Sequence, residues 1–228
     1  MQKLITNTPL DKLLNGGIES DVITNIYGPA GSGKSNITIS AAIAAAALKK
    51  VIYVDTEGSF SLERFRQLGG TERIMKNIIL FEPHMWNEQH IAIEKAEKLA
   101  EKEGVSLVIV DSLVALYRLE LDKENFPVVN KQLATQYSIL SRIARKHKIP
   151  VLVTNQVYGI RTGTEENIEL TSRAIAKYWS KALIELKKAD RPNHRIAIIR
   201  KHRSIAENKS VEFEITESKL KEVKFGIF

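Results

Sequence analysis

The chain has 228 residues, of which 43% are hydrophobic, a formal net charge of +7 and no cysteine. This composition excludes disulfides, thiolate metal sites and cysteine nucleophiles, and no apolar run has the length of a membrane span or signal peptide, so we expect a cytoplasmic protein without a membrane partner. The positive charge favours a polyanionic partner such as nucleic acid, although an ordinary basic enzyme has the same balance.

The first element that carries chemistry is a glycine-rich stretch near the N-terminus. After a short helix predicted over residues 12–15, the apolar run Val22 to Tyr27 leads into GPAGSGKS, which matches the phosphate-binding pattern G-x-x-x-x-G-K-[ST] at every fixed position. An Ala- and Ile-rich helix, residues 36–48, follows it, and an ordinary glycine-rich turn needs neither these flanks nor the Gly-Lys-Ser ending. We predict a nucleoside triphosphate site formed by Gly28, Pro29, Ala30, Gly31, Ser32, Gly33, Lys34 and Ser35.

Each part of that loop has a chemical role. Glycines allow successive backbone N–H groups to turn toward the phosphates, and the following helix directs its positive end at them. Lys34 is expected to reach the β and γ oxygens, and the Ser35 hydroxyl to ligate Mg²⁺.

The remaining pattern alternates strands with helices. Helices are predicted over residues 61–68, 88–102 and 129–147, the second with Ile91, Ala92, Lys95, Ala96 and Leu99 along one side. Strands are predicted over residues 51–54, 77–81, 107–110, 150–153, 182–186, 195–199 and 211–216, the last with a period of two. This order predicts an α/β fold with a central, mostly parallel sheet, helices on both faces and antiparallel strands near the C-terminus.

Three of the predicted strands end in polar side chains, at the edge where open α/β sheets bind ligands. Asp111 is a candidate for holding Mg²⁺ through water, although a polar residue can also simply end a strand. Glu57 and Asp55 compete for the role of activating the attacking water, and spacing favours Glu57 because Asp55 abuts the strand. Gln156 could sense the γ-phosphate, or its amide could satisfy local backbone groups.

A polar segment and a basic cluster follow. Residues 157–172 show no period, and we expect a mobile loop there. The side chains that could contact DNA phosphates or a neighbouring subunit's nucleotide are Arg161, Arg173, Arg200, Lys201 and Arg203. A solvated basic edge that discourages aggregation is an equally good interpretation.

Five segments together resemble the RecA-family recombinases: GPAGSGKS, YVDTEGSFSLERF, LVIVDSLVALYR, VTNQV and IRKHRS. The resemblance implies a RecA-like ATPase core with ATP and Mg²⁺ as cofactors. It also implies that Glu57 is the catalytic glutamate, that Asp111 is the Walker B aspartate, and that Arg64 packs on the adenine. Gln156 would link the γ-phosphate to a second DNA-binding loop over residues 157–172, and Arg118 lies at the edge of the first.

The same resemblance bounds the protein's organisation and function. The few residues before Thr8 leave no room for the N-terminal helix-hairpin-helix domain or polymerisation motif of full recombinases, so we expect one domain over residues 1–228 and no long filament, although a homo-oligomer is possible. Our hypothesis is a weak, Mg²⁺-dependent ATPase that binds DNA, preferably single-stranded, and assists homologous recombination and repair. The alternatives are a nucleotide-gated adaptor that binds a recombinase partner without needing hydrolysis, and a RecA-like signalling ATPase of the KaiC kind.

Overall fold

The computed structural model describes residues 2–121, 124–162, 165–170 and 173–223, and only the backbone of residues 157–162, 165–170 and 173. Within these ranges, no helix combines the length and the apolar character that a membrane span requires.

The core of the molecule is one mixed sheet. Its strands are β3 (Ile23–Gly28), β4 (Lys50–Asp55), β5 (Ile78–Phe81), β6 (Val105–Asp111), β7 (Val151–Thr162), β8 (Glu165–Leu170), β9 (Ala182–Lys188), β10 (His194–Lys201), β11 (Ser210–Ile215) and β12 (Leu220–Glu222). The spatial order is β12-β11-β10-β9-β3-β7-β6-β4-β5, and β8 pairs with β7 alone. The strands from β9 to β5 run parallel, whereas β10, β11 and β12 are antiparallel additions. The predicted α/β sheet is therefore confirmed.

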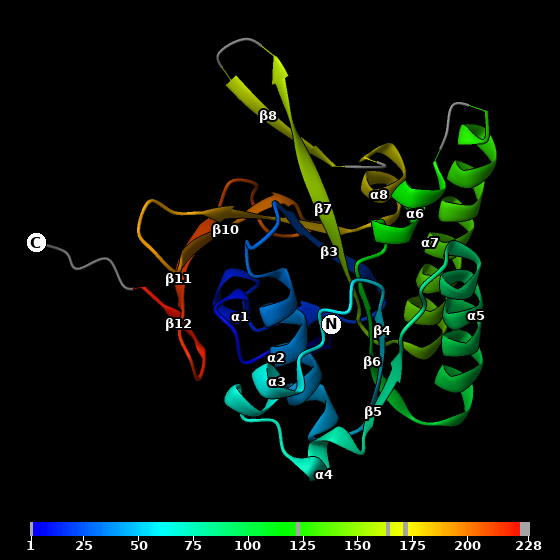
Figure 1. The fold of residues 1–228 in the computed structure, drawn as a ribbon. Helices are drawn as coiled ribbons and strands as arrows, with labels where there is room; N and C mark the ends of the chain where they lie inside the picture. Colours follow the sequence, from blue (N-terminus) through cyan, green and yellow to red (C-terminus); the bar gives the residue numbers. More distant parts are fainter. Residues whose placement is uncertain (1, 122–123, 163–164, 171–172, 224–228) are drawn as a thin grey trace, which may run out of the picture.

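Helices cover both faces of this sheet, as Figure 1 shows. One face carries α1 (Leu10–Leu13), α2 (Lys34–Ala46), α3 (Leu62–Gln67) and α4 (Glu72–Met75). The other carries α5 (Trp86–Lys102), α6 (Ala115–Glu120), α7 (Phe126–His147) and α8 (Arg173–Trp179). A separate two-stranded sheet joins β1 (Lys3–Leu4) to β2 (Ile18–Glu19).

The apolar strands are buried on both sides, which is why they read as continuous hydrophobic runs. In β4, Val51 and Tyr53 pack on the α2 side, while Ile52 and Val54 pack against the α5 and α7 side. Because apolar side chains fill both faces, the polar residues lie where the strands end, at the edge where open α/β sheets bind ligands.

Two predictions from sequence are wrong. Residues 157–162 continue β7 as a strand, and β8 pairs with them antiparallel from Val157 opposite Leu170 to Thr162 opposite Glu165, so the segment is a β-hairpin and not an irregular loop. The predicted apolar side of α5 is also displaced, because Ile91 is 46% exposed and Lys95 is exposed. The face that packs on the core consists of Trp86, Gln89, Ala92, Ile93, Ala96 and Ala100.

Candidate functional site

The glycine-rich loop joins β3 to the first turn of α2, as the motif requires. Gly31 has φ +71° and Gly33, the N-cap of α2, has φ +96°, which are left-handed conformations that favour glycine. A Cβ on Gly28 would lie 2.5 Å from the carbonyl oxygen of Leu186 in β9. The loop is thus a tight cradle of backbone at the positive end of a helix, a geometry suited to phosphate.

Lys34 lies at the first turn of α2 and points back over this cradle. Its Nζ donates hydrogen bonds to the carbonyl oxygens of Gly28 at 3.0 Å and Pro29 at 3.1 Å. Burial lowers the pKa of the Lys34 ammonium, and the negative charges of Glu57 and Asp111 oppose that shift. A bound phosphate would offer this ammonium stronger, charged acceptors than the two carbonyls.

Asp111, at the end of β6, is buried beneath a cluster of hydroxyl groups. Its Oδ1 accepts from Thr154, and its Oδ2 accepts from Tyr53 at 2.9 Å and from Ser59 at 3.1 Å. The Thr38 hydroxyl lies 3.1 Å from the same Oδ2 and donates to the Ser35 carbonyl oxygen at 3.0 Å. Asp111 and Ser35 are therefore one hydroxyl group apart.

This arrangement fits Mg²⁺ held mainly by a nucleotide. Among the residues that the structure describes, no group of three or more His, Asp or Glu side chains could hold a metal by itself. Mg²⁺ usually keeps several waters and takes one or two protein ligands beside substrate phosphates. Ser35 as direct ligand and Asp111 through water would satisfy that pattern.

The two acidic candidates after β4 have different environments. Asp55 is 2% exposed, and its carboxylate accepts from the backbone N–H groups of Glu57 at 3.2 Å, Ser59 at 3.0 Å and Phe60 at 2.8 Å. Glu57 is exposed, and its Oε2 accepts a hydrogen bond from Gln156 Nε2 at 2.7 Å. Asp55 thus shapes the turn, whereas the Glu57 carboxylate is available at the mouth of the site.

Gln156 connects that carboxylate to a further cation. Its Oε1 lies 3.4 Å from Nη1 of Arg118 in α6, which donates to it. The structure therefore brings Glu57, Gln156 and Arg118 together from three separate segments. All three residues can be named from the sequence, but their contact has no local signal, because they are far apart along the chain.

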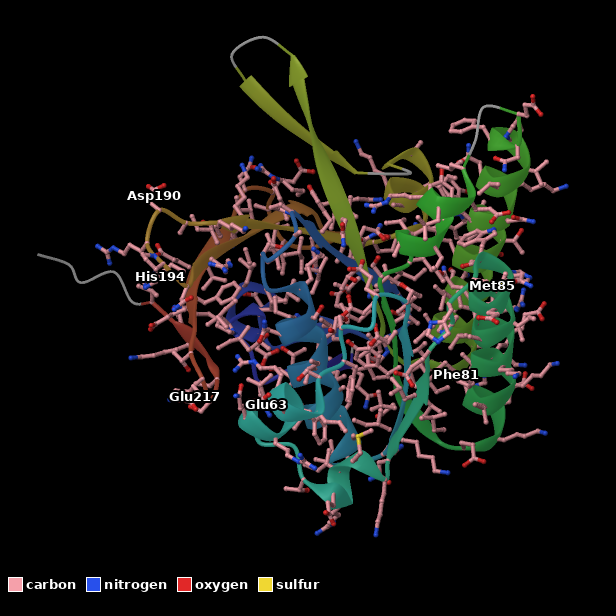
Figure 2. The ribbon with its side chains drawn as sticks, viewed as in Figure 1. Glu63, Phe81, Met85, Asp190, His194 and Glu217 are labelled. Atoms are coloured by element: carbon pink, nitrogen blue, oxygen red, sulfur yellow. The ribbon has the colours of Figure 1, made fainter. Side chains whose placement is uncertain are left out.

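Arg64 of α3 ties this side of the site to the C-terminal strands. It donates to Asn36 Oδ1 at 2.6 Å, to the Thr216 carbonyl at 2.9 Å and to the Glu217 carbonyl at 2.6 Å. Figure 2 shows Glu217 beside Glu63 of α3, where the turn after β11 meets that helix. Contact of Arg64 with an adenine stays a prediction.

Two residues that sequence analysis misses cover the outer side of the phosphate loop. Arg195 Nε donates to the Gly31 carbonyl at 3.1 Å. The Cδ1 of Ile215 would lie 2.8 Å from a Cβ placed on Gly33. Both residues come from the antiparallel strands, so these strands are part of the site as well as of the sheet.

The basic cluster after β10 is held by intramolecular partners. Arg200 pairs with buried Glu185, and its Nε and Nη2 both lie 2.6 Å from Oε2. Lys201 Nζ donates to the carbonyl oxygens of Lys177 at 2.6 Å and Ser180 at 2.8 Å, at the C-terminal end of α8. Arg203 pairs with Glu19 at 2.6 Å and Asp21 at 3.1 Å. A DNA phosphate would have to compete with these contacts.

The last two predicted DNA contacts are placed by their backbone only. Arg161 belongs to the hairpin strand β7 and Arg173 begins α8, but their side chains lie outside the described residues.

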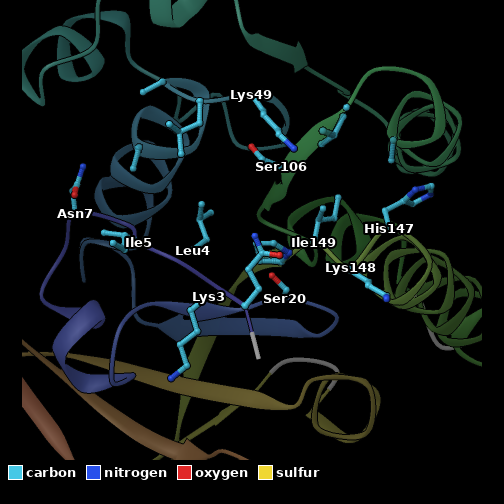
Figure 3. A pocket seen from close by; sticks show the side chains of 18 residues that line it. Lys3, Leu4, Ile5, Asn7, Ser20, Lys49, Ser106, His147, Lys148 and Ile149 are labelled. Atoms are coloured by element: carbon cyan, nitrogen blue, oxygen red, sulfur yellow. The ribbon is translucent and has the colours of Figure 1, made fainter.

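A large hollow lies at the opposite edge of the sheet, far along the strands from the phosphate loop. It has a volume of about 710 Å³ and is lined by residues that include Lys49, Ser106, Lys148 and Ile149 (Figure 3). Of the predicted site residues whose side chains the structure describes, none lines this hollow.

Comparison with known proteins agrees with this geometry. A family model described as Rad51 matches residues 3–223. The chain belongs to the Rad51 family. It is 41% identical over 221 residues to a protein of Methanobrevibacter smithii named "DNA repair and recombination protein RadB", with 94% of each chain covered. A Methanococcoides burtonii protein of the same name is 43% identical over 220 residues, covering 94% of this chain and 95% of that protein.

A solved structure extends the likeness to three dimensions. The crystal structure of the RadB recombinase superposes with a TM-score of 0.81 at 36% identity, covering 97% of this chain and 100% of that one. Membership of the Rad51 family confirms the resemblance to the RecA-family recombinases and the RecA-like fold that it implied.

Proposed function

We propose that this chain is a weak, Mg²⁺-dependent ATPase that binds DNA and acts in homologous recombination and DNA repair. The observation that carries the ATPase proposal is the direct contact of Glu57 with Gln156 at the edge of the sheet that also holds the phosphate loop and Asp111. The role in recombination and repair rests on the family and on the printed names of the relatives.

In this proposal each residue has a separate task. The loop from Gly28 to Ser35 cradles the phosphates, and Lys34 exchanges its carbonyl partners for phosphate oxygens. Ser35 and Asp111 would hold Mg²⁺, which would supply positive charge to neutralise the phosphates. Glu57 orients the attacking water and accepts a proton from it. Gln156 fixes the Glu57 carboxylate by a hydrogen bond.

Replacement of Glu57 by Gln tests the catalytic assignment. We expect ATP turnover to fall by about 10²- to 10⁴-fold, the usual contribution of a general base, with ATP binding retained. Glu63→Gln is a matched control, because Glu63 is an exposed glutamate on nearby α3. Lys34→Ala should abolish ATP binding itself. Unchanged turnover in Glu57→Gln would remove Glu57 from the proposed role.

The DNA part of the proposal depends on charge. The net charge of +7 and the residues Arg161, Arg173, Arg200, Lys201 and Arg203 predict single-stranded DNA binding that weakens steeply with salt. Fluorescence anisotropy of labelled DNA across a salt series, with and without ATP and Mg²⁺, measures this. A flat salt response would contradict it, and no DNA binding under any condition would favour a signalling ATPase or an adaptor.

A second candidate is the nucleotide-gated adaptor, which binds a recombinase partner when ATP is bound and does not need hydrolysis. Two observations favour it. Gln156 donates a hydrogen bond to the Glu57 carboxylate. Three of the predicted DNA contacts already have partners within the chain, namely Arg200, Lys201 and Arg203. If Glu57→Gln protein binds a recombinase in an ATP-dependent manner and supports recombination without hydrolysis, the adaptor is the better description. Cytoplasmic location and a possible homo-oligomer are further parts of this proposal.

A further inference from the structure

The contact between Glu57 and Gln156 does not stand alone, because Arg118 approaches the same amide from its other end. Gln156 Nε2 donates to Glu57 Oε2 at 2.7 Å, and Gln156 Oε1 accepts from Arg118 Nη1 at 3.4 Å. The nitrogen faces an anion and the oxygen faces a cation. A reversed amide would place like partial charges against both neighbours, so the two charged groups together allow only one orientation.

Arg118 is carried by a short helix whose own position is fixed. In α6, Leu116 is 6% exposed and Tyr117 is 2% exposed, and both belong to the core on the α7 side. The Tyr117 hydroxyl also donates to Asn130 Oδ1 of α7 at 2.6 Å. The backbone of Arg118 is therefore anchored, and its half-buried side chain extends to the rim of the site.

We propose that Arg118 is a positioning residue that sets the Gln156 amide and, through it, the Glu57 carboxylate. Only the expected effect of Arg118 on ATP turnover rests on the proposed ATPase function. Arg118 does not touch the reacting atoms. Its hydrogen bond to Gln156 Oε1 restrains rotation of the amide, so that the Nε2 N–H group points at Glu57 in a fixed direction.

The first test follows the amide directly and does not depend on hydrolysis. The chain contains six glutamines, at positions 2, 67, 89, 132, 136 and 156, so NMR of protein labelled with ¹⁵N in glutamine side chains gives a small set of signals. Gln156→Asn identifies the Gln156 pair by its loss. Arg118→Met and Glu57→Gln should each move that pair, whereas Arg142→Met should not, because Arg142 pairs with Glu97 on the outer side of α7. Unmoved Gln156 signals in Arg118→Met would overturn the proposal.

The second test asks whether the contact matters for chemistry. We expect Arg118→Met to lower kcat for ATP about tenfold or more with KM within about twofold, because a displaced group loses orientation without losing binding. Arg118→Lys, which keeps the charge, should recover part of the loss. In a double-mutant cycle with Gln156→Asn the two losses should not add, since both act through one amide.

The outcomes separate this inference from the proposed function. Additive losses, or equal falls in kcat for Arg118→Met and Arg142→Met, would show that Arg118 acts by another route and would overturn the proposal. A wild-type protein that binds ATP without hydrolysing it would refute the ATPase and leave the amide test decisive for Arg118.

Discussion

Arg200 offers the clearest choice between a structural and a DNA-binding role. Its guanidinium lies 2.6 Å from the Oε2 of Glu185, whose side chain is 7% exposed, and it also donates to Asn208. Arg200→Met removes the cation and keeps most of the side-chain length, so the carboxylate of Glu185 is left buried with less compensation.

The cost follows from the burial of the pair. Removing one partner of a fully buried ion pair costs about 3–5 kcal/mol, because an uncompensated charge remains. The Arg200 side chain is 35% exposed, so water reaches this pair. Lys187 Nζ also lies 3.7 Å from Glu185 Oε1 and supplies a second positive charge. We therefore expect the free energy of unfolding to fall by about 2 kcal/mol, which corresponds to a melting temperature lower by roughly 4–8 °C in a chain of this size.

Urea unfolding followed by tryptophan fluorescence measures this loss, since Trp86 is buried in the core. Arg142→Met is the matched control: its ion pair with Glu97 is exposed, so it should cost less than about 0.5 kcal/mol. Adding Glu185→Gln to Arg200→Met should recover part of the stability, because a neutral amide needs no counter-charge.

The same variant is then assayed for single-stranded DNA at a temperature where it is folded. If Arg200 serves Glu185, affinity should stay within about twofold of the wild type. The reasoning would be refuted if stability were unchanged and the slope of DNA affinity against salt fell by about 1, as the loss of one phosphate contact predicts. Arg200 would then be a DNA contact.

Two further predictions concern pH and the phosphate loop. Burial lowers the pKa of His202, with Glu19 opposing the shift, and the ring Nδ1 accepts from the Ser204 N–H at 3.2 Å. The folded state therefore resists protonation of His202, whereas the unfolded state accepts it, so the contribution of His202 to folding stability falls as pH drops through about 6.5. His202→Gln should flatten the slope of melting temperature against pH between about 7 and 5. A slope identical to that of the wild type would contradict this. Gly33 has φ +96° and faces Ile215, so Gly33→Ala should lower the free energy of unfolding in urea by about 1–3 kcal/mol and weaken ATP binding in anisotropy titrations. Wild-type values for both quantities would exclude backbone strain at this position.

The parts of the fold that sequence predicts are those with a strong local signal. The loop from Gly28 to Ser35 has fixed spacing, and the strand before Asp111 is a run of buried residues, so both were predictable from neighbouring positions alone. The hairpin of β7 and β8 could not be predicted, because its sequence carries no regular hydrophobic period.

The contacts that decide individual roles could not be predicted, because their partners are distant in the chain. Nothing around Arg200 indicates that Glu185 is its partner, and Arg203 pairs with Glu19 from the other end of the sequence. The same holds for Gln156 and Glu57, whose contact depends on how β4 and β7 are placed in one sheet. The residues of the site can thus be named from local patterns, whereas the contacts between them depend on the fold.

The position of β3 has a consequence for how the protein is made. This strand carries the phosphate loop, yet one of its two neighbours is β9, and the side chains that press on the loop, Arg195 and Ile215, come later still. A ribosome extends a chain from its N-terminus, so the loop is made before β9, Arg195 and Ile215. The surroundings of the loop are therefore complete only after these later strands have been made and paired.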